Sequence, residues 1–272
     1  MKLLALKLRA WLQIFRHFRN PLLVSAMRLG WLKPSLFAYH ITAAGKRYVM
    51  LARPSATCHS DISIMREVLV EGEYGQVLPL LPAGPVRVLD IGANLGSFTV
   101  WLQHHHGLRE AYCFEPEPGS FNLCRFNLAN NGCETATPIP KAIGGRNRTI
   151  EMWTDTARPG SVNIYGQPSS AAKEKKSVEV IALADWLRAT PGNFDLLKMD
   201  CEGAEWEIFR ETPPDLLRRF NVIIAEVHAD PVQPNTPVAE FRQRLEAAGF
   251  TTVRDDNCWH GLYIGVQKPS QG

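Results

Sequence analysis

An α/β fold with a doubly wound, mostly parallel sheet is predicted by two features of the sequence. From Val86 onward, five short runs are apolar throughout rather than alternating: VRVLDI, EAYCFEP, TATPIPKAI, DLLKMD and NVIIAEVH. Continuous apolar runs are typical of parallel strands that helices cover on both faces. Helix-period or polar stretches separate the runs, and a regular alternation of strand and helix favours the doubly wound class.

The C-terminal part of the chain completes the predicted sheet. SVEVIALADWL reads as a strand that runs into a helix, and TTVRDD and GLYIGVQK read as two more strands. We expect a Rossmann-like, mostly parallel sheet of seven strands, which the tail strands TTVRDD and GLYIGVQK close with an antiparallel last strand. The irregular stretch 146–176 has a Gly/Ser/Pro-rich centre and the charged sequence AAKEKK, and we interpret it as a short β-excursion that ends in a mobile loop.

The first 70 residues are predicted to form an N-terminal extension, followed by a main domain over residues 71–272. Apolar residues recur at spacings of four and three in MKLLALKLRAWLQIFRHFRNPLL, which predicts a helix that Pro21 ends. One face of this helix comprises Leu4, Leu8, Trp11, Phe15 and Phe18, and the other comprises Lys2, Arg9, Gln13, Arg16 and Asn20.

A basic amphipathic helix of this kind has three interpretations. It packs on its own domain, it packs on the partner in a homodimer, or residues 1–20 lie peripherally on an anionic membrane surface. No stretch reaches the ~20 apolar residues that a membrane span needs. After the helix, FAYHITAAGKRYVMLAR predicts a hairpin that turns near Ala44–Lys46, and a short helix is expected around Ile62–Val70.

Composition and charge narrow the class of protein. With 45% hydrophobic and 21% charged residues, the chain is typical of a globular protein with one sizeable core. A formal charge of +3, without basic and aromatic residues interleaved in the main domain, argues against a nucleic-acid partner. The six cysteines form no C-x-x-C pair and no Cys/His spacing typical of zinc, so we predict no metal and a reducing, cytoplasmic location.

The stretch VRVLDIGANLGSFTVWL predicts a strand, a glycine turn and a helix. Such a unit binds ligands because the backbone N–H groups at a helix start are unpaired and the turn lets a ligand approach closely. The turn has the form Asp90-x-Gly92-x-Asn94-x-Gly96 rather than the G-x-G-x-x-G of dinucleotide sites. An acid suits an ammonium group better than a phosphate, so Asp90 favours a ligand with a cationic amino-acid end.

A second acid follows at the end of the next predicted strand. Glu115 comes 23 residues after Gly92, near the ~20-residue spacing at which an acid in nucleotide-binding units accepts ribose hydroxyls. Together with Asp90 and the glycine turn, Glu115 predicts that the cofactor is S-adenosylmethionine. The alternative is an ordinary tight turn with solvated acids at the strand ends.

Four segments of the main domain resemble the FkbM family of S-adenosylmethionine-dependent methyltransferases: DIGANLGSFT, FEPEP, LLKMDCEGAEWEIF and IIAEVH. GEYGQV at 72–77 is also similar to that family's opening segment, which implies that Glu73 and Tyr74 lie at the cofactor. The resemblance covers roughly residues 65–268. It implies O-methylation of a sugar hydroxyl in a glycan, a glycolipid or a polyketide-type metabolite, so the acceptor is expected to be a small molecule or a glycan.

The candidate catalytic side chains follow the fourth and fifth predicted strands. Ligands of such folds bind beyond the carboxyl ends of the strands, where Asp200, Glu202, Glu226 and His228 are expected. We predict His228 as the general base because an unperturbed pKa of about 6.5 leaves it largely neutral. Asp200 is the alternative general base, or it orients the acceptor hydroxyl, and it is also predicted to contact the cofactor. Glu202 is a further catalytic candidate. Glu205 and Glu226 are predicted to bind the acceptor; for Glu202 and Glu205, capping of the next helix is an alternative.

Other functions remain open at this point. The N/D-P-P-Y/F motif common in enzymes that methylate exocyclic amines is absent after LLKMD, which argues against that class. An NAD-dependent sugar oxidoreductase would use the same fold class, but it would need the G-x-G-x-x-G turn. A non-catalytic module that binds the cofactor is a third alternative.

Overall fold

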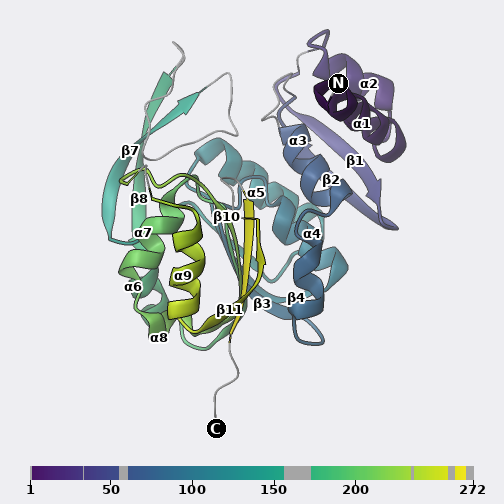
Figure 1. Ribbon diagram of the computed structural model, residues 1–272. Coiled ribbons are helices and arrows are strands. Elements are labelled where there is room, and N and C mark those ends of the chain that lie inside the picture. The colour runs from purple at the N-terminus through teal and green to yellow at the C-terminus, as the bar shows by residue number, and fades with distance from the viewer. Residues whose placement is uncertain are drawn as a thin grey trace.

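The computed structural model describes residues 2–32, 34–54, 61–155, 173–233, 236–256 and 261–267. A seven-stranded sheet forms its centre, in the order β11-β12-β10-β9-β3-β4-β5 (Figure 1). The strands are β3 (Val86–Ile91), β4 (Leu108–Phe114), β5 (Ala136–Ile139), β9 (Phe194–Met199), β10 (Phe220–Val227), β11 (Phe250–Asp255) and β12 (Gly261–Gln267). The predicted seven-stranded doubly wound sheet is confirmed.

The direction of the strands also agrees with the prediction. Strands β10, β9, β3, β4 and β5 pair in parallel, whereas β12 runs antiparallel to both β10 and β11. The central parallel strands β3, β9 and β10 are buried almost throughout, as the continuous apolar runs require, whereas β4 and the edge strand β5 are only partly buried. Because the parallel strands share one direction, their carboxyl ends meet at a single edge of the sheet.

Helices cover both faces of the sheet (Figure 1). One face carries α4 (Ser97–His105) and α5 (Pro118–Asn130), and the other carries α6 (Leu183–Ala189), α7 (Ala204–Glu211), α8 (Pro214–Leu217) and α9 (Ala239–Ala247). Two apolar clusters correspond to these faces, one around Val88 and Leu102 and the other around Leu89 and Trp206. The alternation of Val88 and Leu89 between the clusters follows from the two-residue period of a strand.

The described residues before β3 form three α-helices, a hairpin, a π-helix and a 3₁₀-helix, and the 3₁₀-helix lies beyond the predicted extension. These elements are α1 (Lys2–His17), α2 (Pro21–Arg28), β1 (Phe37–Ala43), β2 (Lys46–Ala52), α3 (Asp61–Met65), the π-helix η1 (Arg66–Glu71) and the 3₁₀-helix η2 (Gly75–Leu80). The hairpin near Ala44–Lys46 and the helix near Ile62–Val70 are confirmed. Pro21 does not end the first helix: α1 ends at His17, and Pro21 opens α2, where a missing N–H costs nothing.

The predicted apolar face of α1 is divided in the structure. Phe18, directly after the helix, packs inward together with Ile14, whereas Leu8 and Phe15 of the predicted face are 59% and 51% exposed. The predicted apolar face is therefore only partly used for packing on the protein's own domain. The side of α1 that packs on the rest of the chain lies between the predicted apolar and polar faces. Part of the apolar face therefore remains exposed to solvent.

Two asparagines of α5 attach the hairpin to the main domain. Asn127 accepts a hydrogen bond from the N–H of Leu51 at 2.7 Å and donates to the carbonyl oxygen of the same residue at 3.1 Å. Asn131, one turn later, makes the same pair of bonds with Val49 at 3.0 and 2.9 Å. These side chains satisfy backbone groups at the edge of β2, which would otherwise be unpaired. One apolar cluster continues from the extension into the sheet, and the division at residue 70 stays a prediction.

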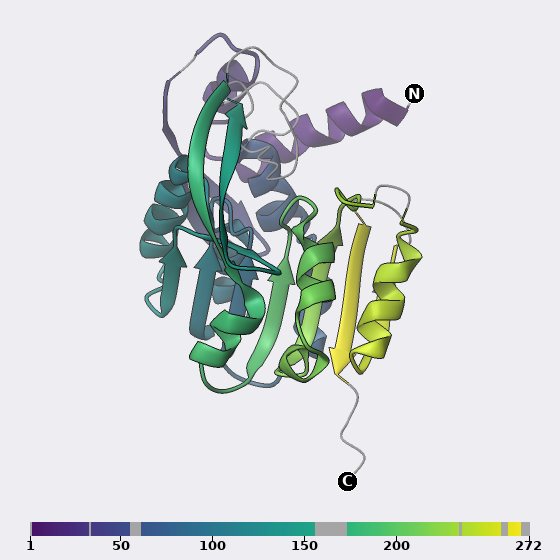
Figure 2. The same cartoon turned by 90° about the vertical axis from the view of Figure 1, so that its left-hand side faces the viewer.

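A second, three-stranded sheet has the order β6-β8-β7 and forms the predicted β-excursion. Its strands are β6 (Ala142–Gly144), β7 (Arg148–Asp155) and β8 (Lys173–Ala182), and β7 and β8 form a long antiparallel arm (Figure 2). The expected mobile loop falls on residues 156–172, which lie outside the described residues.

Candidate active site

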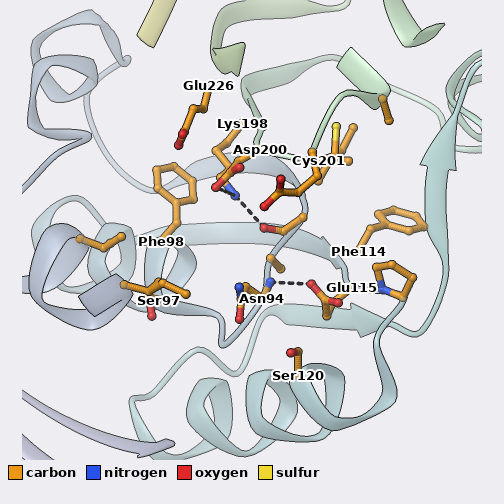
Figure 3. A pocket seen from close by; sticks show the side chains of 18 of the residues that line it. Asn94, Ser97, Phe98, Phe114, Glu115, Ser120, Lys198, Asp200, Cys201 and Glu226 are labelled. Atoms are coloured by element: carbon orange, nitrogen blue, oxygen red, sulfur yellow. Dashed lines mark hydrogen bonds and ion pairs between the residues drawn. The ribbon is translucent and has the colours of Figure 1, made fainter. Parts of the chain in front are cut away.

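A cavity of about 650 Å³ lies over the carboxyl ends of β3, β4, β9 and β10 (Figure 3). The residues predicted from the sequence that line it are Glu73, Tyr74, Gly92, Asn94, Glu115, Asp200, Glu202, Glu226 and His228. Three predicted site residues do not line it: Asp90, Gly96 and Glu205. The topology thus brings together side chains that are up to 155 residues apart in sequence, from Glu73 to His228.

Gly92 is required by the neighbouring strand. Its φ is +75°, and a Cβ at this position would lie 1.8 Å from the backbone oxygen of Asp200. The N–H of Asp200 donates to Ile91 at 3.1 Å, so the end of β9 is fixed against the turn. The glycine therefore allows two backbone segments to approach closely, and this contact places Asp200 beside the turn.

Asp90, which is predicted from the sequence to bind the cofactor, lies beneath the turn and does not line the cavity. It is fully buried; one carboxylate oxygen accepts from Thr99 Oγ1 at 2.7 Å, and the other lies 3.2 Å from Lys198 Nζ. Lys198 also donates to the carbonyl oxygen of Gly92 at 2.8 Å and lies 3.9 Å from Asp200. Asp90 thus fixes the lysine that supports the turn.

Lys198 was not recognised in the sequence, although a lysine inside the apolar strand LLKMD is a detectable signal. Its side chain is almost fully buried and reaches the cavity. Burial lowers the pKa of Lys198, but the charges of Asp90 and Asp200 outweigh burial and raise the pKa above its ordinary value. The site therefore contains a permanent positive charge between two carboxylates.

The start of α4 presents unpaired polar atoms to the cavity. Asn94 adopts the left-handed conformation with φ +49°, and its side-chain oxygen is buried with no hydrogen-bond partner. Ser97, at the first turn of α4, is 2% exposed, and its hydroxyl is likewise buried without a partner. Both residues line the cavity. Unpaired buried polar groups are costly, so these two indicate a polar ligand at this position.

Gly96 belongs to the fold and not to the ligand site, which corrects its predicted role. It precedes α4 with φ +76°, and a Cβ there would lie 3.1 Å from the sulfur of Cys124 on α5. The small residue lets α4 and α5 approach each other. The second glycine of the turn therefore serves helix packing, whereas Asn94 and Ser97 face the cavity.

Glu115 sits at the end of β4 as predicted, and it lines the cavity. Its two carboxylate oxygens accept hydrogen bonds of 2.8 Å from the N–H groups of Asn94 and Glu117 (Figure 3 marks the bond to Asn94). Burial raises the pKa of Glu115 to about 7, against the effect of the two N–H groups. Each oxygen keeps a further lone pair, so the carboxylate can still accept from a ligand hydroxyl.

His228 lies just beyond β10 and is held by Glu205, which is predicted from the sequence to bind the methyl acceptor. Glu205 is fully buried, and one of its oxygens lies 3.1 Å from His228 Nδ1. The same carboxylate accepts from the N–H groups of Cys201 and Gly203, both at 2.8 Å. Glu205 is therefore a positioning residue behind the histidine. Its bonds to the N–H groups of Cys201 and Gly203, just before α7, resemble the alternative prediction that it caps this helix. The prediction that Glu205 contacts the methyl acceptor is wrong.

Three further carboxylates surround the other ring nitrogen of His228. Nε2 lies 3.9 Å from Asp200, 3.8 Å from Glu202 and 3.9 Å from Glu226. Burial lowers the pKa of His228, but the hydrogen bond and charge of Glu205 and the charges of Asp200 and Glu202 outweigh it and raise the pKa to about 10. A histidine with this pKa is charged at neutral pH, which argues against the expected largely neutral imidazole, and the role of His228 as general base stays a prediction.

The acids of the cavity are hard to ionise together. Burial, with the charge of Asp200, raises the pKa of Glu226 to about 8. Burial likewise raises the pKa of Glu202 to about 7, against the opposing charge of His228. For Glu73, burial and the charge of Glu67 raise the pKa to about 7. A ligand that brings a positive charge into the cavity would favour ionisation of these groups.

The same cluster has the composition of a cation site. Asp200, Glu226 and His228 each offer one ligand atom, and these atoms lie within 4.8 Å of one another. Such a group can hold a divalent ion only if the imidazole loses its proton, because metal ligands must be deprotonated. The sequence analysis predicts no metal here.

The N-terminal extension contributes one wall of the cavity. Ser63, Ile64, Glu67 and Val68 line it from α3 and η1. Tyr74 is buried beside them and packs edge-on against Phe98 of α4, with ring centroids 5.0 Å apart. The extension is thus part of the site, since its removal would open the cavity on this side.

The sheet order, the antiparallel β12 and a cavity over the carboxyl ends of the strands define a class I methyltransferase. Within this class, the chain belongs to the FkbM family: the family model described as "Methyltransferase FkbM domain" matches residues 90–252. The predicted family and fold are therefore confirmed, and the protein is a methyltransferase.

Individual relatives are distant. The chain is 20% identical over 230 residues to "Methyltransferase 1" of Beauveria bassiana, covering 78% of this chain and 89% of that protein. It is 28% identical over 152 residues to "2-O-methyltransferase NoeI" of Sinorhizobium fredii, covering 50% and 60%. Among solved structures, a methyltransferase FkbM from Methylobacillus flagellatus superimposes with a TM-score of 0.47 and 11% identity, covering 70% of this chain and 45% of that one.

Proposed function

We propose that the protein is an S-adenosylmethionine-dependent O-methyltransferase that methylates a hydroxyl of a sugar in a glycan, a glycolipid or a secondary metabolite. The observation that carries this proposal is one cavity with two chemically different ends. One end presents Glu115, Asn94 and Ser97, and the other presents Asp200 beside the charged His228. The first end fits a nucleoside with an amino-acid tail, and the second fits an acceptor that must lose a proton.

The residues of the cofactor end fit S-adenosylmethionine. Glu115 would accept the two ribose hydroxyls, because both of its oxygens keep free lone pairs beyond their bonds to N–H groups. The unpaired Asn94 side-chain oxygen and Ser97 hydroxyl would bind polar groups of the methionyl end. Glu73, which lines the cavity, would take the role toward the ammonium group that Asp90 cannot take directly.

At the acceptor end, Asp200 is our proposed proton acceptor. His228 holds its own proton at neutral pH, so it would orient Asp200 and the acceptor as a charged donor, with Glu205 fixing the ring from behind. Glu202 and Glu226 would accept hydrogen bonds from neighbouring hydroxyls of the acceptor. Both line the cavity and face His228.

When bound, S-adenosylmethionine supplies an electrophilic methyl group. The protein would hold the acceptor oxygen in line with that group, and such positioning accounts for much of the acceleration in a displacement reaction. As the new C–O bond forms and the C–S bond breaks, the hydroxyl proton would pass to Asp200. General base catalysis of this kind contributes roughly 10²–10⁴-fold.

The polarity of this end supports a sugar acceptor, and the name of one relative supports transfer to an oxygen. Vicinal hydroxyls suit a surface with several carboxylates, since a carboxylate accepts from two hydroxyls at once. The relative NoeI of Sinorhizobium fredii is named a 2-O-methyltransferase. The NAD-dependent oxidoreductase alternative loses its basis, because the chain belongs to a methyltransferase family and lacks the G-x-G-x-x-G turn.

Labelling of the acceptor tests the proposal. The protein would be incubated with methyl-labelled S-adenosylmethionine and separate glycan, lipid, metabolite, protein and nucleic-acid fractions. We expect label on a carbohydrate-containing product, as an ether that survives alkaline hydrolysis, and none with Asp200→Asn. Label confined to protein or nucleic acid would contradict the acceptor class. Cofactor binding without any turnover would instead favour the non-catalytic module.

A further inference from the structure

Exposed apolar side chains are concentrated on the N-terminal extension. Of twelve large apolar side chains that the described chain exposes, nine lie between residues 8 and 36: Leu8, Leu12, Phe15, Leu22, Leu23, Leu29, Trp31, Leu32 and Leu36. The most exposed are Leu22 at 74% and Trp31 at 77%. Single exposed apolar residues are common, but a gathering of this size in one segment marks an interaction surface.

The helix α1 separates its inner and outer apolar residues. At about 100° per residue, Leu8, Leu12 and Phe15 share one side of the helix, whereas the buried Ile14 points to another side. Arg16 lies next to the outer side and is exposed. The outer side is therefore an apolar stripe bordered by basic charge, which is the pattern of a helix at a membrane interface.

The charge of the chain is strongly divided. Residues 1–60 contain ten Lys or Arg and no Asp or Glu, which gives +10. The remaining 212 residues contain 20 Lys or Arg and 27 Asp or Glu, which gives −7 and accounts for the total of +3. The modest overall charge thus conceals a basic extension, whose preferred partner is anionic.

A basic depression of about 520 Å³ lies beside the apolar stripe. Arg16 and Arg19 border it from the end of α1, and Arg47 borders it from β2. His17, His40, Thr42 and Tyr48 are the other polar residues of its lining, and none of the described residues that line it is an acid. Three guanidinium groups around one hollow suit a phosphate group, because arginine binds phosphate with paired N–H donors.

Other partners fit these observations less well. A second copy of the chain would bring two segments of charge +10 together if the same surface paired with itself. A nucleic acid would match the charge but would leave the leucines of α1 and α2 without contact. No described helix is long and apolar enough to cross a bilayer, so contact with lipid would be peripheral.

We propose that the N-terminal extension docks the protein on the surface of a membrane that contains anionic phospholipids. The apolar stripe Leu8–Leu12–Phe15, with Trp31, inserts among the lipid chains near the headgroups. The depression bordered by Arg16, Arg19 and Arg47 binds a lipid phosphate. Figure 2 shows α1 at the end of the molecule toward which the parallel strands point, so docking would bring the cavity close to the lipid surface.

Sedimentation with vesicles tests this proposal in the full-length protein. We expect co-sedimentation with vesicles of phosphatidylcholine and phosphatidylglycerol, little with phosphatidylcholine alone, and release by high salt. The double variants Leu12→Asp/Phe15→Asp and Arg16→Glu/Arg47→Glu should each lower the apparent affinity by roughly tenfold or more. Val253→Asp and Arg125→Glu are matched controls, since these residues are exposed elsewhere, and both should bind like the unmodified chain.

Three results would overturn the proposal. The first is absence of binding to anionic vesicles, and the second is binding by both double variants that equals binding by the unmodified chain. The third is a dimer, detected by analytical ultracentrifugation, that Leu12→Asp/Phe15→Asp dissociates while vesicles have no effect. Inorganic phosphate separates a lipid site from a site for free phosphate: it should compete only weakly with vesicles, and tight binding of phosphate without vesicle binding counts against the proposal.

Discussion

The carboxylate of Glu205 lies 3.1 Å from Nδ1 of His228, at the start of α7 and directly behind the ring. Two N–H groups fix this carboxylate, and no solvent reaches it. The relationship explains why a histidine next to a substrate cavity is charged and not neutral. It also assigns the two ring nitrogens different tasks: Nδ1 is held by the protein, and Nε2 faces the carboxylates of the cavity.

Replacement of Glu205 tests this relationship. Glu205→Gln keeps the shape of the side chain but removes its charge, so the pKa of His228 should fall from about 10. The measurement is an NMR titration of the histidine ring. Glu211→Gln, on the same helix but paired with the exposed Arg146, should leave the titration unchanged. A His228 that titrates alike in all three proteins would contradict the assigned role.

The pH dependence of turnover distinguishes the two candidate bases. If Asp200 accepts the proton while His228 stays charged, kcat should fall as pH rises through the pKa of His228, near 10 in the free protein. If neutral His228 were the base, kcat would instead rise through this range. Asp200→Asn should lower kcat by roughly 10²–10⁴-fold, with a much smaller effect on the dissociation constant of the cofactor.

Stability should fall with rising pH because of Glu226. Its folded pKa of about 8 exceeds the ordinary value of 4.5, so the folded state binds more protons than the unfolded state between these values. The free energy of unfolding therefore decreases as pH rises from about 4.5 to about 8. Glu226→Gln should raise the melting temperature at pH 8 by a few degrees and have little effect at pH 4. A variant that gains nothing at pH 8 would argue against a buried, destabilised carboxylate.

Gly92 and Gly132 form a matched pair for the close approach at the turn. Both have a positive φ, at +75° and +71°, but a Cβ at Gly92 would meet the backbone of Asp200 at 1.8 Å, whereas Gly132 has open space. Gly132→Ala should cost about 1–2 kcal/mol from backbone strain alone. Gly92→Ala should cost well over 4 kcal/mol or prevent folding, measured by denaturant unfolding. Equal losses would show that φ, and not the neighbouring strand, requires the glycine.

The sequence predicted the sheet because strand and helix signals are local. Continuous apolar runs such as VRVLDI and NVIIAEVH identify buried parallel strands, and the rule for carboxyl ends then brings Glu115, Asp200 and His228 to one edge. The polar residues at the strand ends of the cavity therefore follow from pattern and topology alone, whereas the wall formed by α3 and η1 does not. The family resemblance was confirmed for the same reason, because the motifs lie at those strand ends.

What the sequence could not predict depends on direction and on packing partners. Whether Asp90 points into the cavity or beneath the turn is decided by Lys198, a residue 108 positions later that captures it at 3.2 Å. The pKa of His228 depends on four carboxylates from two segments, so its ordinary value was a poor guide. The inner side of α1 is set by the hairpin on which it packs, as the bridge between Phe18 and Ile41 indicates.

Calorimetric titration with S-adenosylhomocysteine, the demethylated cofactor, tests the central claim most directly. We predict saturable one-site binding to the unmodified protein, and a loss of affinity of at least about tenfold in Glu115→Gln, because the ribose would lose a charged acceptor. Glu134 is an exposed acid just before β5, the strand next to β4, and Glu134→Gln should bind like the unmodified protein. Absence of binding to the unmodified protein, or equal affinity in Glu115→Gln, would contradict the claim that this cavity holds S-adenosylmethionine with its ribose on Glu115.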